Sequence, residues 1–257
     1  MGADSWEPGQ YDRFAVEREQ PFWDLCALVQ PTAAPRLVDL GCGDGRLTVE
    51  LARRLHAGTA VGVDSSPAML ARCAARAASA VRFEAGDLAT WSAAGDVDVV
   101  FSNAALQWVP DHRAVLGRWR RSLAPGGQMA VQVPANADHP SHRVLAALAE
   151  RWLGDQAPPD PVAAHVLTPE AYAVLLHQLG FAHRHVRLQV YGHLLDSPAE
   201  VVEWVKGTTL TRIRAVLPAG EYEAFVHEYR RLLLAELGER RPFLYPFKRI
   251  LLWGRLA

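Results

Sequence analysis

Residues 36–45 read RLVDLGCGDG, a short apolar run that passes directly into three glycines at alternate positions. Gly41, Gly43 and Gly45 allow a sharp backbone turn because they carry no Cβ, and a helical pattern begins at about Asp44. This stretch predicts a β-strand, a tight turn and an α-helix. Four later apolar runs also have the length of buried strands, at 59–63, 80–84, 97–102 and 128–133.

Amphipathic stretches separate these runs, at about 44–56, 66–78 and 111–124. Ser66-Pro67 is typical of a helix N-terminus, since Ser caps free N–H groups and Pro is favoured at the first helical position. Pro125-Gly126-Gly127 is expected to end the third helix before the fifth strand. Strands that alternate with helices predict an α/β fold with a doubly wound, mainly parallel sheet.

The pattern of expected helices and strands changes after Val133. Longer helical stretches lie near 141–153, 169–179, 198–206 and 219–237, and two strand-like alternations lie at 184–191 and 247–253. Nothing in the composition marks a second independent domain. We therefore expect a single domain over 1–257, with a ligand-binding core at 36–134 and a helical cap built from residues 1–30 and about 141–240.

Composition and charge exclude several classes of protein. The 257 residues are 50% hydrophobic and 21% charged, with a net charge of −1, which argues against a general nucleic-acid binder. No apolar run approaches the roughly 20 residues of a membrane span. Residues 1–10 contain acids rather than a basic and apolar leader, so we expect a cytoplasmic protein without membrane partners.

The positions of the cysteines and basic residues further restrict the class of protein and the kind of site. Cys26, Cys42 and Cys73 are widely spaced and form no CxxC pair, so neither a disulfide scaffold nor a metal site is expected. Residues 206–257 hold ten Lys and Arg against five Glu. In one interpretation these cations only face solvent. In the other, a few of them face a cleft and hold a small anionic substrate. The sequence does not fix the oligomeric state.

Two acids in register with the glycine turn point to a nucleoside ligand. Asp64 ends the second predicted strand, 19 residues after Gly45, where its carboxylate could accept hydrogen bonds from both ribose hydroxyls. Asp87 follows the third strand, where it could accept from an adenine amine while Leu88 packs on the ring. A plain turn-forming Asp is the alternative for Asp87.

The spacing of the glycines distinguishes between two kinds of nucleoside. A dinucleotide fingerprint reads GxGxxG and places a pyrophosphate at the helix N-terminus, whereas this turn reads GxGxG and is preceded by Asp39. A carboxylate there would repel a pyrophosphate but suits a nearby ammonium or sulfonium group. The pattern favours S-adenosylmethionine over NAD.

These motifs carry a family resemblance. The stretches VDLGCGDG (38–45), GVDSSPAML (62–70), AGDLATW (85–91), SNAALQWVPDH (102–112) and LAPGGQMAVQVP (123–134) resemble the class I S-adenosylmethionine-dependent methyltransferases. The whole chain is similar to the trans-aconitate methyltransferase family, through WEPGQYDRF (6–14), Arg18 with Pro21-Phe22, VEWV (202–205), GTTL (207–210) and PFKR (246–249). The resemblance implies a Rossmann-like, seven-stranded sheet with a helical cap, and methylation of a small polycarboxylic acid.

The resemblance also implies a role for each matching residue. Asp39, Gly41, Gly43 and Gly45 would hold the methionyl end, and Cys42 lies among them with no chemistry of its own. Asp64 would bind the ribose beside Ser65 and Met69, and Asp87 with Leu88 would bind the adenine. Asn103 and Ala104 would lie under the sulfonium, and Trp108 would close over the methionyl side. The chain departs from the family pattern at Lys206 and Arg212.

Methyl transfer from a sulfonium to a carboxylate is a direct displacement. A carboxylate with a pKa of about 4 is already ionised at neutral pH. We therefore expect the reaction to need no general base and no metal. The other carboxylates of the acid would be gripped by Arg. The substrate-binding candidates are Tyr11, Arg18, Trp204, Arg212, Arg214 and Arg249.

Other functions stay open at this point. SNAALQWVPDH also resembles malonyl-carrier-protein carboxyl methyltransferases, and a tailoring methyltransferase that modifies carbon or nitrogen would share the same core. An NAD-dependent oxidoreductase would use a similar sheet. A non-catalytic nucleoside-binding module is also compatible with the glycine turn.

Overall fold

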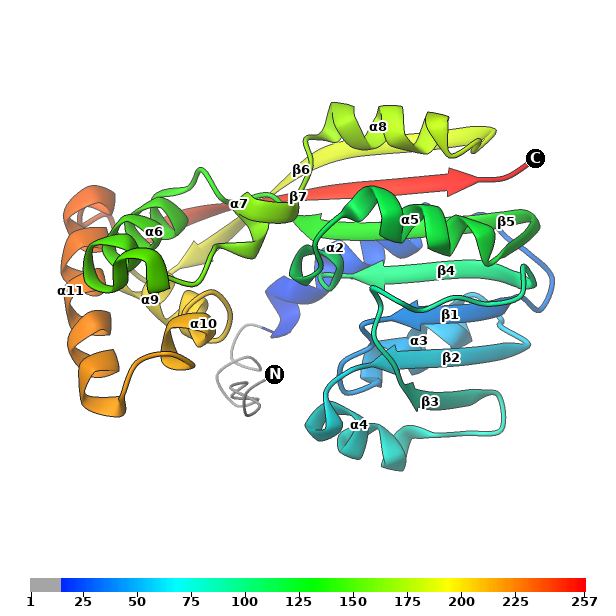
Figure 1. Cartoon of the computed structure of the whole chain (residues 1–257), viewed down its shortest axis with the longest axis horizontal. Coiled ribbons are helices and arrows are strands. Elements are labelled where there is room, and N and C mark those ends of the chain that lie inside the picture. Colours follow the sequence, from blue (N-terminus) through cyan, green and yellow to red (C-terminus); the bar gives the residue numbers. More distant parts are fainter. Residues whose placement is uncertain (1–14) are drawn as a thin grey trace. The chain divides into compact units, whose positions relative to one another are not determined.

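The computed structural model describes residues 15–257, with side chains from Glu19 onward. Its strands are β1 (Arg36–Leu40), β2 (Thr59–Asp64), β3 (Val81–Ala85), β4 (Val97–Asn103), β5 (Leu123–Pro134), β6 (His183–Leu195) and β7 (Phe243–Arg255) (Figure 1). Its α-helices are α2 (Ala15–Cys26), α3 (Arg46–Arg54), α4 (Pro67–Cys73), α5 (His112–Arg121), α6 (Pro140–Leu153), α7 (Pro161–His165), α8 (Pro169–Gln178), α9 (Ala199–Lys206), α10 (Thr211–Arg214) and α11 (Ala219–Leu237). Single 3₁₀ turns lie at Ala74–Arg76, Leu106–Trp108 and Gly154–Gln156.

Contacts between residues divide the chain into two compact units. The sheet unit contains residues 20–134, 165–189 and 249–257. The helical unit contains residues 15–19, 135–164 and 190–248 of the described chain. The segment 165–189, which the sequence analysis assigned to the cap, therefore belongs with the sheet.

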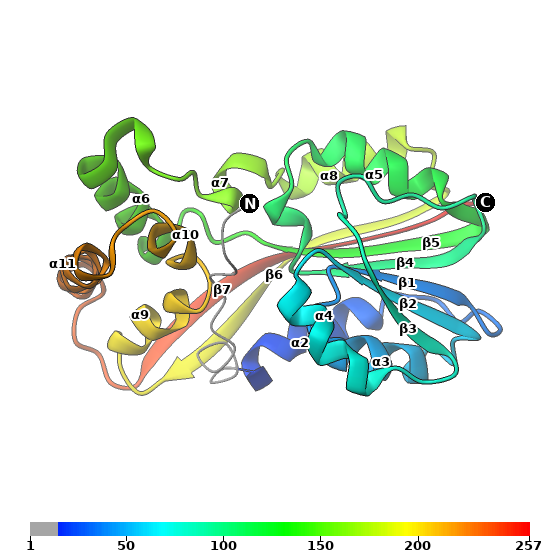
Figure 2. The same ribbon diagram turned by 60° about the horizontal axis from the view of Figure 1, so that its bottom comes forward.

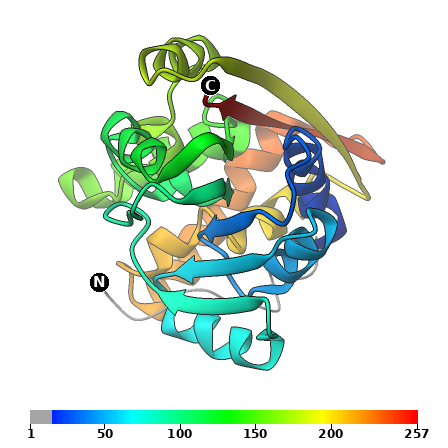
Figure 3. The same cartoon turned by 90° about the vertical axis from the view of Figure 1, so that its right-hand side faces the viewer.

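The sheet has seven strands within the described residues, in the order β3-β2-β1-β4-β5-β7-β6. The strands from β3 to β5 run parallel, and β7 pairs with β5 antiparallel. Helices α2 and α3 lie on one face and α5 and α8 on the other (Figures 2 and 3). The prediction of a doubly wound, mainly parallel, seven-stranded α/β sheet is confirmed.

Each face of the sheet buries an apolar layer. Phe22 and Leu25 of α2 and Leu51 of α3 join Phe101 and Ala130 in one cluster. Trp119 of α5 and Tyr172 of α8 are fully buried on the opposite side. Because the parallel strands are covered on both faces, their residues are apolar in nearly continuous runs rather than in strict alternation.

One boundary differs from the sequence prediction. Helix α5 ends at Arg121, and β5 begins at Leu123 instead of Gln128. Leu123 pairs with Val97, and Gln128 pairs with Val99 after a shift in register. Pro125-Gly126-Gly127 therefore forms an irregularity inside the strand, and not the connection before it.

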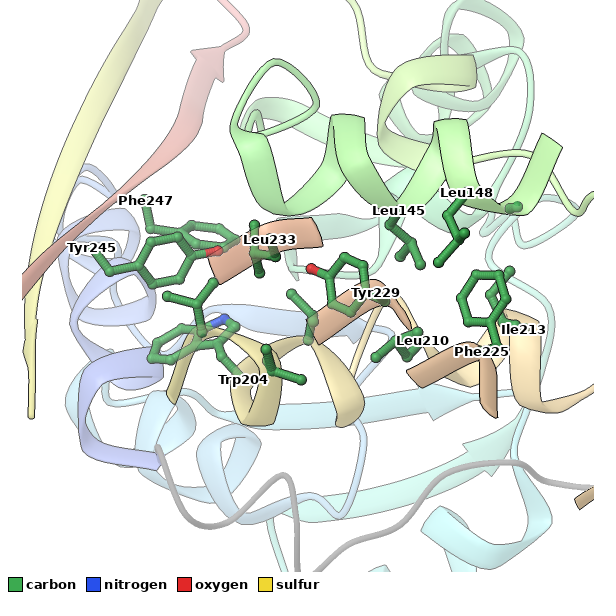
Figure 4. Close-up of a cluster of buried hydrophobic side chains, with 14 of the residues drawn as sticks. Leu145, Leu148, Trp204, Leu210, Ile213, Phe225, Tyr229, Leu233, Tyr245 and Phe247 are labelled. Carbon is green, nitrogen blue, oxygen red and sulfur yellow. The ribbon is translucent and has the colours of Figure 1, made fainter. Parts of the chain in front are cut away.

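The helical unit has its own core. Leu145 and Leu148 of α6, Trp204 of α9 and Phe225 and Tyr229 of α11 pack in one cluster (Figure 4). Helix α11 spans the predicted range 219–237, and Gly238 follows it with φ 77°.

No α-helix in the described part of the chain is both long enough and apolar enough to cross a membrane.

Candidate active site

The glycine turn joins β1 to α3 in the sheet unit. Gly41, Gly43 and Gly45 have φ values of 79°, 57° and 76°, a region that L side chains avoid. A Cβ on Gly41 would lie 2.2 Å from the Cβ of Ala105, whereas one on Gly43 would meet nothing within 4 Å. Gly41 is thus required by packing, while the backbone at Gly43 faces open space that a ligand could enter.

Asp64 links the turn after β1 to the turn after β2. Its Oδ2 accepts a hydrogen bond from the Gly43 N–H at 2.8 Å, and its Oδ1 accepts from the Ser66 N–H at 2.9 Å. A carboxylate offers about four acceptor positions, so each oxygen can accept a second donor such as a ribose hydroxyl. The structure places Ser65, which is exposed, and Met69, which is half-buried, on the segment that follows.

Asp39 carries a buried carboxyl and lies on β1, one residue before the strand ends. Its side chain is only 4% exposed, and its Oδ2 accepts a hydrogen bond from the Thr48 hydroxyl of α3 at 2.6 Å. Burial raises the pKa of Asp39 to about 7, a rise that the Thr48 hydrogen bond opposes and the charge of Asp64 adds to. The negative charge expected beneath the turn therefore depends on pH.

The two cysteines beside the turn are buried thiols. Cys73 donates to the Gly43 carbonyl at 3.2 Å, and Cys42 is 9% exposed. Burial raises the pKa of both thiols, so they stay protonated at neutral pH. This agrees with a packing role for Cys42.

The segment after β3 approaches the same turn. Leu88 lies 3.6 Å from the position of a Cβ on Gly41, and its carbonyl accepts a hydrogen bond from the Trp119 indole at 3.0 Å. Asp87 is exposed, and its Oδ1 accepts from the Ala89 N–H at 2.8 Å. Leu88 is thus placed to pack on a ligand. One carboxylate oxygen of Asp87 is used by a hydrogen bond within its own turn.

Asn103 and Ala104 form the turn after β4. Ala104 has φ 54°, a left-handed conformation that is rare outside glycine and is often found at functional sites. Its N–H donates to the Gln132 carbonyl at 3.0 Å. Trp108 in the following 3₁₀ turn is 43% exposed, so a large aromatic surface is available there.

The helical unit holds a buried charged group around Arg212. Arg212 is 3.9 Å from Asp160, and Asp160 accepts a hydrogen bond from Nδ1 of His142 at 2.9 Å. Burial raises the pKa of Asp160, but the hydrogen bond and charge of His142 and the charge of Arg212 together hold it below its ordinary value. Among the described residues, one terminal nitrogen of Arg212 has no hydrogen-bond partner.

The other predicted substrate residues have different surroundings. Trp204 is 1% exposed, and its ring centroid lies 4.8 Å from that of His193 and 5.8 Å from that of Phe247, so it packs in the core of the helical unit. Arg214 is exposed and lies over the Tyr222 ring. Arg249 of β7 is 8% exposed. Tyr11 and the side chain of Arg18 lie outside the described residues.

No group of three or more His, Cys, Asp or Glu residues that could hold a metal ion occurs in the part of the chain described here.

Comparison with known proteins identifies the chain. Residues 37–127 match a family described as a methyltransferase domain. The trans-aconitate 2-methyltransferase of Deinococcus radiodurans is 42% identical over 96% of this chain and 96% of its own length. That of Streptomyces avermitilis is 43% identical over 96% of this chain and 95% of its own length. The chain belongs to the trans-aconitate 2-methyltransferase family.

Solved structures share the fold. Phosphoethanolamine N-methyltransferase 2 of Haemonchus contortus, in complex with S-adenosyl-L-methionine, has a TM-score of 0.56 and 16% identity over 96% of this chain and 57% of its own. An S-adenosylmethionine-dependent methyltransferase of Mesorhizobium loti has a TM-score of 0.54 and 22% identity over 93% of this chain and 97% of its own. Together with membership of the trans-aconitate 2-methyltransferase family, this confirms the predicted methyltransferase and rules against the NAD-dependent oxidoreductase.

Sequence reasoning missed the partners of Arg212 in this family member. His142 and Asp160 are 18 residues apart, and Arg212 follows Asp160 by 52. No periodic pattern links such positions. The one available signal was the acid Asp160 between two prolines at 159 and 161.

Proposed function

We propose that this protein transfers the methyl group of S-adenosylmethionine to one carboxylate of trans-aconitate or of a closely similar polycarboxylic acid. One observation carries the proposal: identity of 42% across nearly the full length of a relative named for this reaction. The proposed acceptor is a free small anion, so neither a nucleic acid nor a membrane is part of the proposal. A cytoplasmic location is proposed on the sequence argument alone.

The residues around the glycine turn fit this cofactor. The open backbone at Gly43, the acceptor positions of Asp64 and the apolar surface of Leu88 supply what a nucleoside with a charged sulfur needs. S-adenosylmethionine, when bound, supplies a methyl group activated by a positively charged sulfur. We propose that the following residues hold it: Asp39, Gly41, Cys42, Gly43, Gly45, Asp64, Ser65, Met69, Asp87, Leu88, Asn103, Ala104 and Trp108.

The protein's own contribution is positioning and exclusion of water. An acceptor carboxylate is ionised at neutral pH, so no side chain has to remove a proton from it. Alignment of two reacting groups contributes up to about 7–11 kcal/mol to a barrier when the geometry is ideal.

Arg212 is the strongest candidate for gripping a carboxylate that does not react. Its guanidinium is largely buried, and Nε and one terminal nitrogen donate hydrogen bonds to the carbonyls of Thr209 and Pro158. The other terminal nitrogen lies 3.9 Å from Asp160 and makes no hydrogen bond among the described residues, so we propose that it donates to the ligand. Tyr11, Arg18, Arg214 and Arg249 remain secondary candidates. A buried Arg with an unused donor is a better receptor than an exposed Arg, because water competes less for its hydrogen bonds.

A substrate panel tests the proposed function. The assay measures kcat/KM for methyl transfer from labelled S-adenosylmethionine to trans-aconitate, cis-aconitate, citrate, succinate and a malonyl-carrier protein. The proposal expects trans-aconitate or a close tricarboxylic analogue to be methylated fastest, with a monomethyl ester identified by mass. Preference for the carrier-bound malonyl group, or no esterified acid at all, would contradict it.

A further inference from the structure

Strand β5 carries two buried glutamines on the same face of the sheet, Gln128 and Gln132. Gln128 is fully satisfied: its Oε1 accepts from the Gln30 N–H at 2.8 Å and from the Trp253 indole at 3.0 Å. Its Nε2 donates to the Gln30 carbonyl at 2.9 Å and to the Thr32 hydroxyl at 3.2 Å. This is the ordinary condition of a buried amide, which pairs both of its polar atoms.

Gln132 is different. Its side chain is completely buried, yet neither Oε1 nor Nε2 has a hydrogen-bond partner among the residues that the structure describes. Its neighbour across the parallel ladder is Asn103, whose Oδ1 is buried and also lacks a partner within the described chain. Buried amide atoms without partners destabilise a fold, so two adjacent ones at the end of the sheet call for a functional reason.

The two amides border a strained turn. Ala104 directly follows Asn103 with φ 54°, and its N–H is held by the Gln132 carbonyl. Its own carbonyl accepts a hydrogen bond from Gln107 Nε2 at 2.7 Å. These contacts fix the turn in a conformation that Ala rarely adopts. The polar atoms of Asn103 and Gln132 are therefore held at a defined place at the carboxyl ends of β4 and β5.

The strand order separates this place from the nucleoside. The glycine turn, Asp64 and Asp87 follow β1, β2 and β3, which form one half of the parallel sheet. Asn103 and Gln132 end on β4 and β5, on the other side of β1. In S-adenosylmethionine the methyl-bearing sulfur is attached to the ribose, so a ligand whose ribose and adenine occupy the first half can place its sulfur beside β4, next to the second half.

We propose that Gln132 is the receptor for the reacting carboxylate of the acid substrate, with its Nε2 donating a hydrogen bond to one of the carboxylate oxygens. This inference rests on the proposed function. The other oxygen donates an electron pair to the methyl carbon, the carbon–sulfur bond breaks, and its electron pair stays on the sulfur, which becomes neutral. No proton moves.

An uncharged donor suits the reacting carboxylate. An Arg would form a bidentate ion pair and withdraw the electron density that the attack requires, whereas a neutral amide orients the carboxylate with a weaker bond. The cationic residues are then left for the carboxylates that do not react. Because the Gln132 amide is completely buried, the acid reaches it only after surrounding side chains shift, and it then reacts away from water.

The test replaces Gln132 by Met, which is similar in length and apolar, and measures methyl transfer, S-adenosylhomocysteine affinity and thermal stability. Loss of one hydrogen bond to a charged group predicts that kcat/KM for the acid falls about 10- to 100-fold. The affinity for S-adenosylhomocysteine stays within about twofold and the melting temperature stays the same or rises, because an unpaired amide has been removed from the core.

Gln128→Met is the matched control on the same strand. It should lower the melting temperature, since it removes four hydrogen bonds, while kcat/KM per folded molecule stays within about twofold. Gln132→Glu is the second variant and should lose more activity than Gln132→Met, because a carboxylate there repels the acid.

Three results would overturn the inference: Gln132→Met with unchanged kcat/KM, Gln132→Met with a lowered melting temperature, or Gln132→Glu with full activity. Failure of the proposed function is a separate outcome, in which the wild-type protein methylates no acid of the panel.

Discussion

At the scale of single residues, two carboxylates beside one glycine turn have different environments and so different tasks. Asp64 is partly exposed and accepts two backbone N–H groups, whereas Asp39 is buried against Thr48. Both positions were predicted from the sequence because they are in register with the glycines. Their difference was not predicted, since burial depends on helix α3 covering one face of β1.

Replacement of Asp64 by Ala is expected to weaken S-adenosylhomocysteine binding about 10- to 100-fold, because it removes the ribose acceptor and frees the Gly43 N–H. Calorimetric titration measures the affinity. The control is Glu84→Ala, an exposed acid on the adjacent strand that forms an ion pair with Arg82 and should leave the affinity unchanged. Equal losses in both variants would mean that Asp64 has no special role.

Asp39 makes cofactor binding depend on pH. With a pKa of about 7, its ionised fraction rises as pH rises from 6 to 8, and the ionised form attracts a sulfonium. The ratio of affinities for S-adenosylmethionine over S-adenosylhomocysteine should therefore increase roughly several-fold across that range. Titrations that change both affinities equally cancel in this ratio. Asp39→Asn should abolish the increase, and an unchanged increase in that variant would refute the assignment.

The same shift acts on stability in the opposite direction. Because the folded state holds the Asp39 proton up to a higher pH than the unfolded state does, this residue lowers the free energy of unfolding as pH rises from about 4 to about 7. Such a cost at a buried position is consistent with a functional reason for keeping the carboxyl there.

At the scale of elements, the glycine turn after β1 defines the site more than any side chain does. Strands β1 to β4 lie within one or two residues of their predicted bounds, because short apolar runs between helical patterns leave little choice. The start of β5 was placed five residues late, since Pro125-Gly126-Gly127 has the composition of a connection while its backbone forms an irregular part of the ladder.

Gly43→Ala separates the ligand role of the turn from its conformation. A Cβ there meets nothing within 4 Å, so the folding cost is the left-handed conformation alone, about 1–2 kcal/mol. Gly126→Ala is matched to it, with φ 72° and equally open space. Both variants should lose similar stability in urea unfolding, but only Gly43→Ala should lose S-adenosylhomocysteine affinity. If both keep full affinity, no ligand approaches Gly43.

At the scale of the whole molecule, the glycine turn and its neighbouring acids belong to the sheet unit, and the buried group around Arg212 belongs to the helical unit. The family resemblance predicted the seven-stranded sheet. It did not predict the group of His142, Asp160 and Arg212, because these residues come from distant segments and the chain departs from the family pattern at Arg212. The burial of Trp204 was not predicted for a related reason: burial of an aromatic on α9 depends on α11 and β7 packing around it.

Removal of Asp160 measures how much the group of His142, Asp160 and Arg212 contributes to stability. Asp160→Ala leaves Arg212 and His142 buried without their shared acceptor, and about 3–5 kcal/mol of unfolding free energy is expected to be lost. Because the pKa of Asp160 is held low, the difference from wild type should shrink as pH falls below about 4. Denaturant unfolding checks this, with the exposed Asp155→Ala as control. Equal stability of the two variants at neutral pH would contradict the packing described.

Arg212→Met should raise the KM for the acid about tenfold or more and leave S-adenosylhomocysteine affinity unchanged, because it removes one ionic grip on the substrate. Arg231→Met, at an exposed residue that forms an ion pair with Glu228, is its control and should change neither value. Initial-rate kinetics measure both variants. An equal rise in KM in the two variants would contradict the role of Arg212.

The most direct single measurement is a calorimetric titration of the purified protein with S-adenosylmethionine, S-adenosylhomocysteine and NAD under identical conditions. The account predicts that the two sulfur nucleosides bind with one site per chain and that NAD gives no heat of binding. Saturable binding of NAD with no response to either sulfur nucleoside would contradict it.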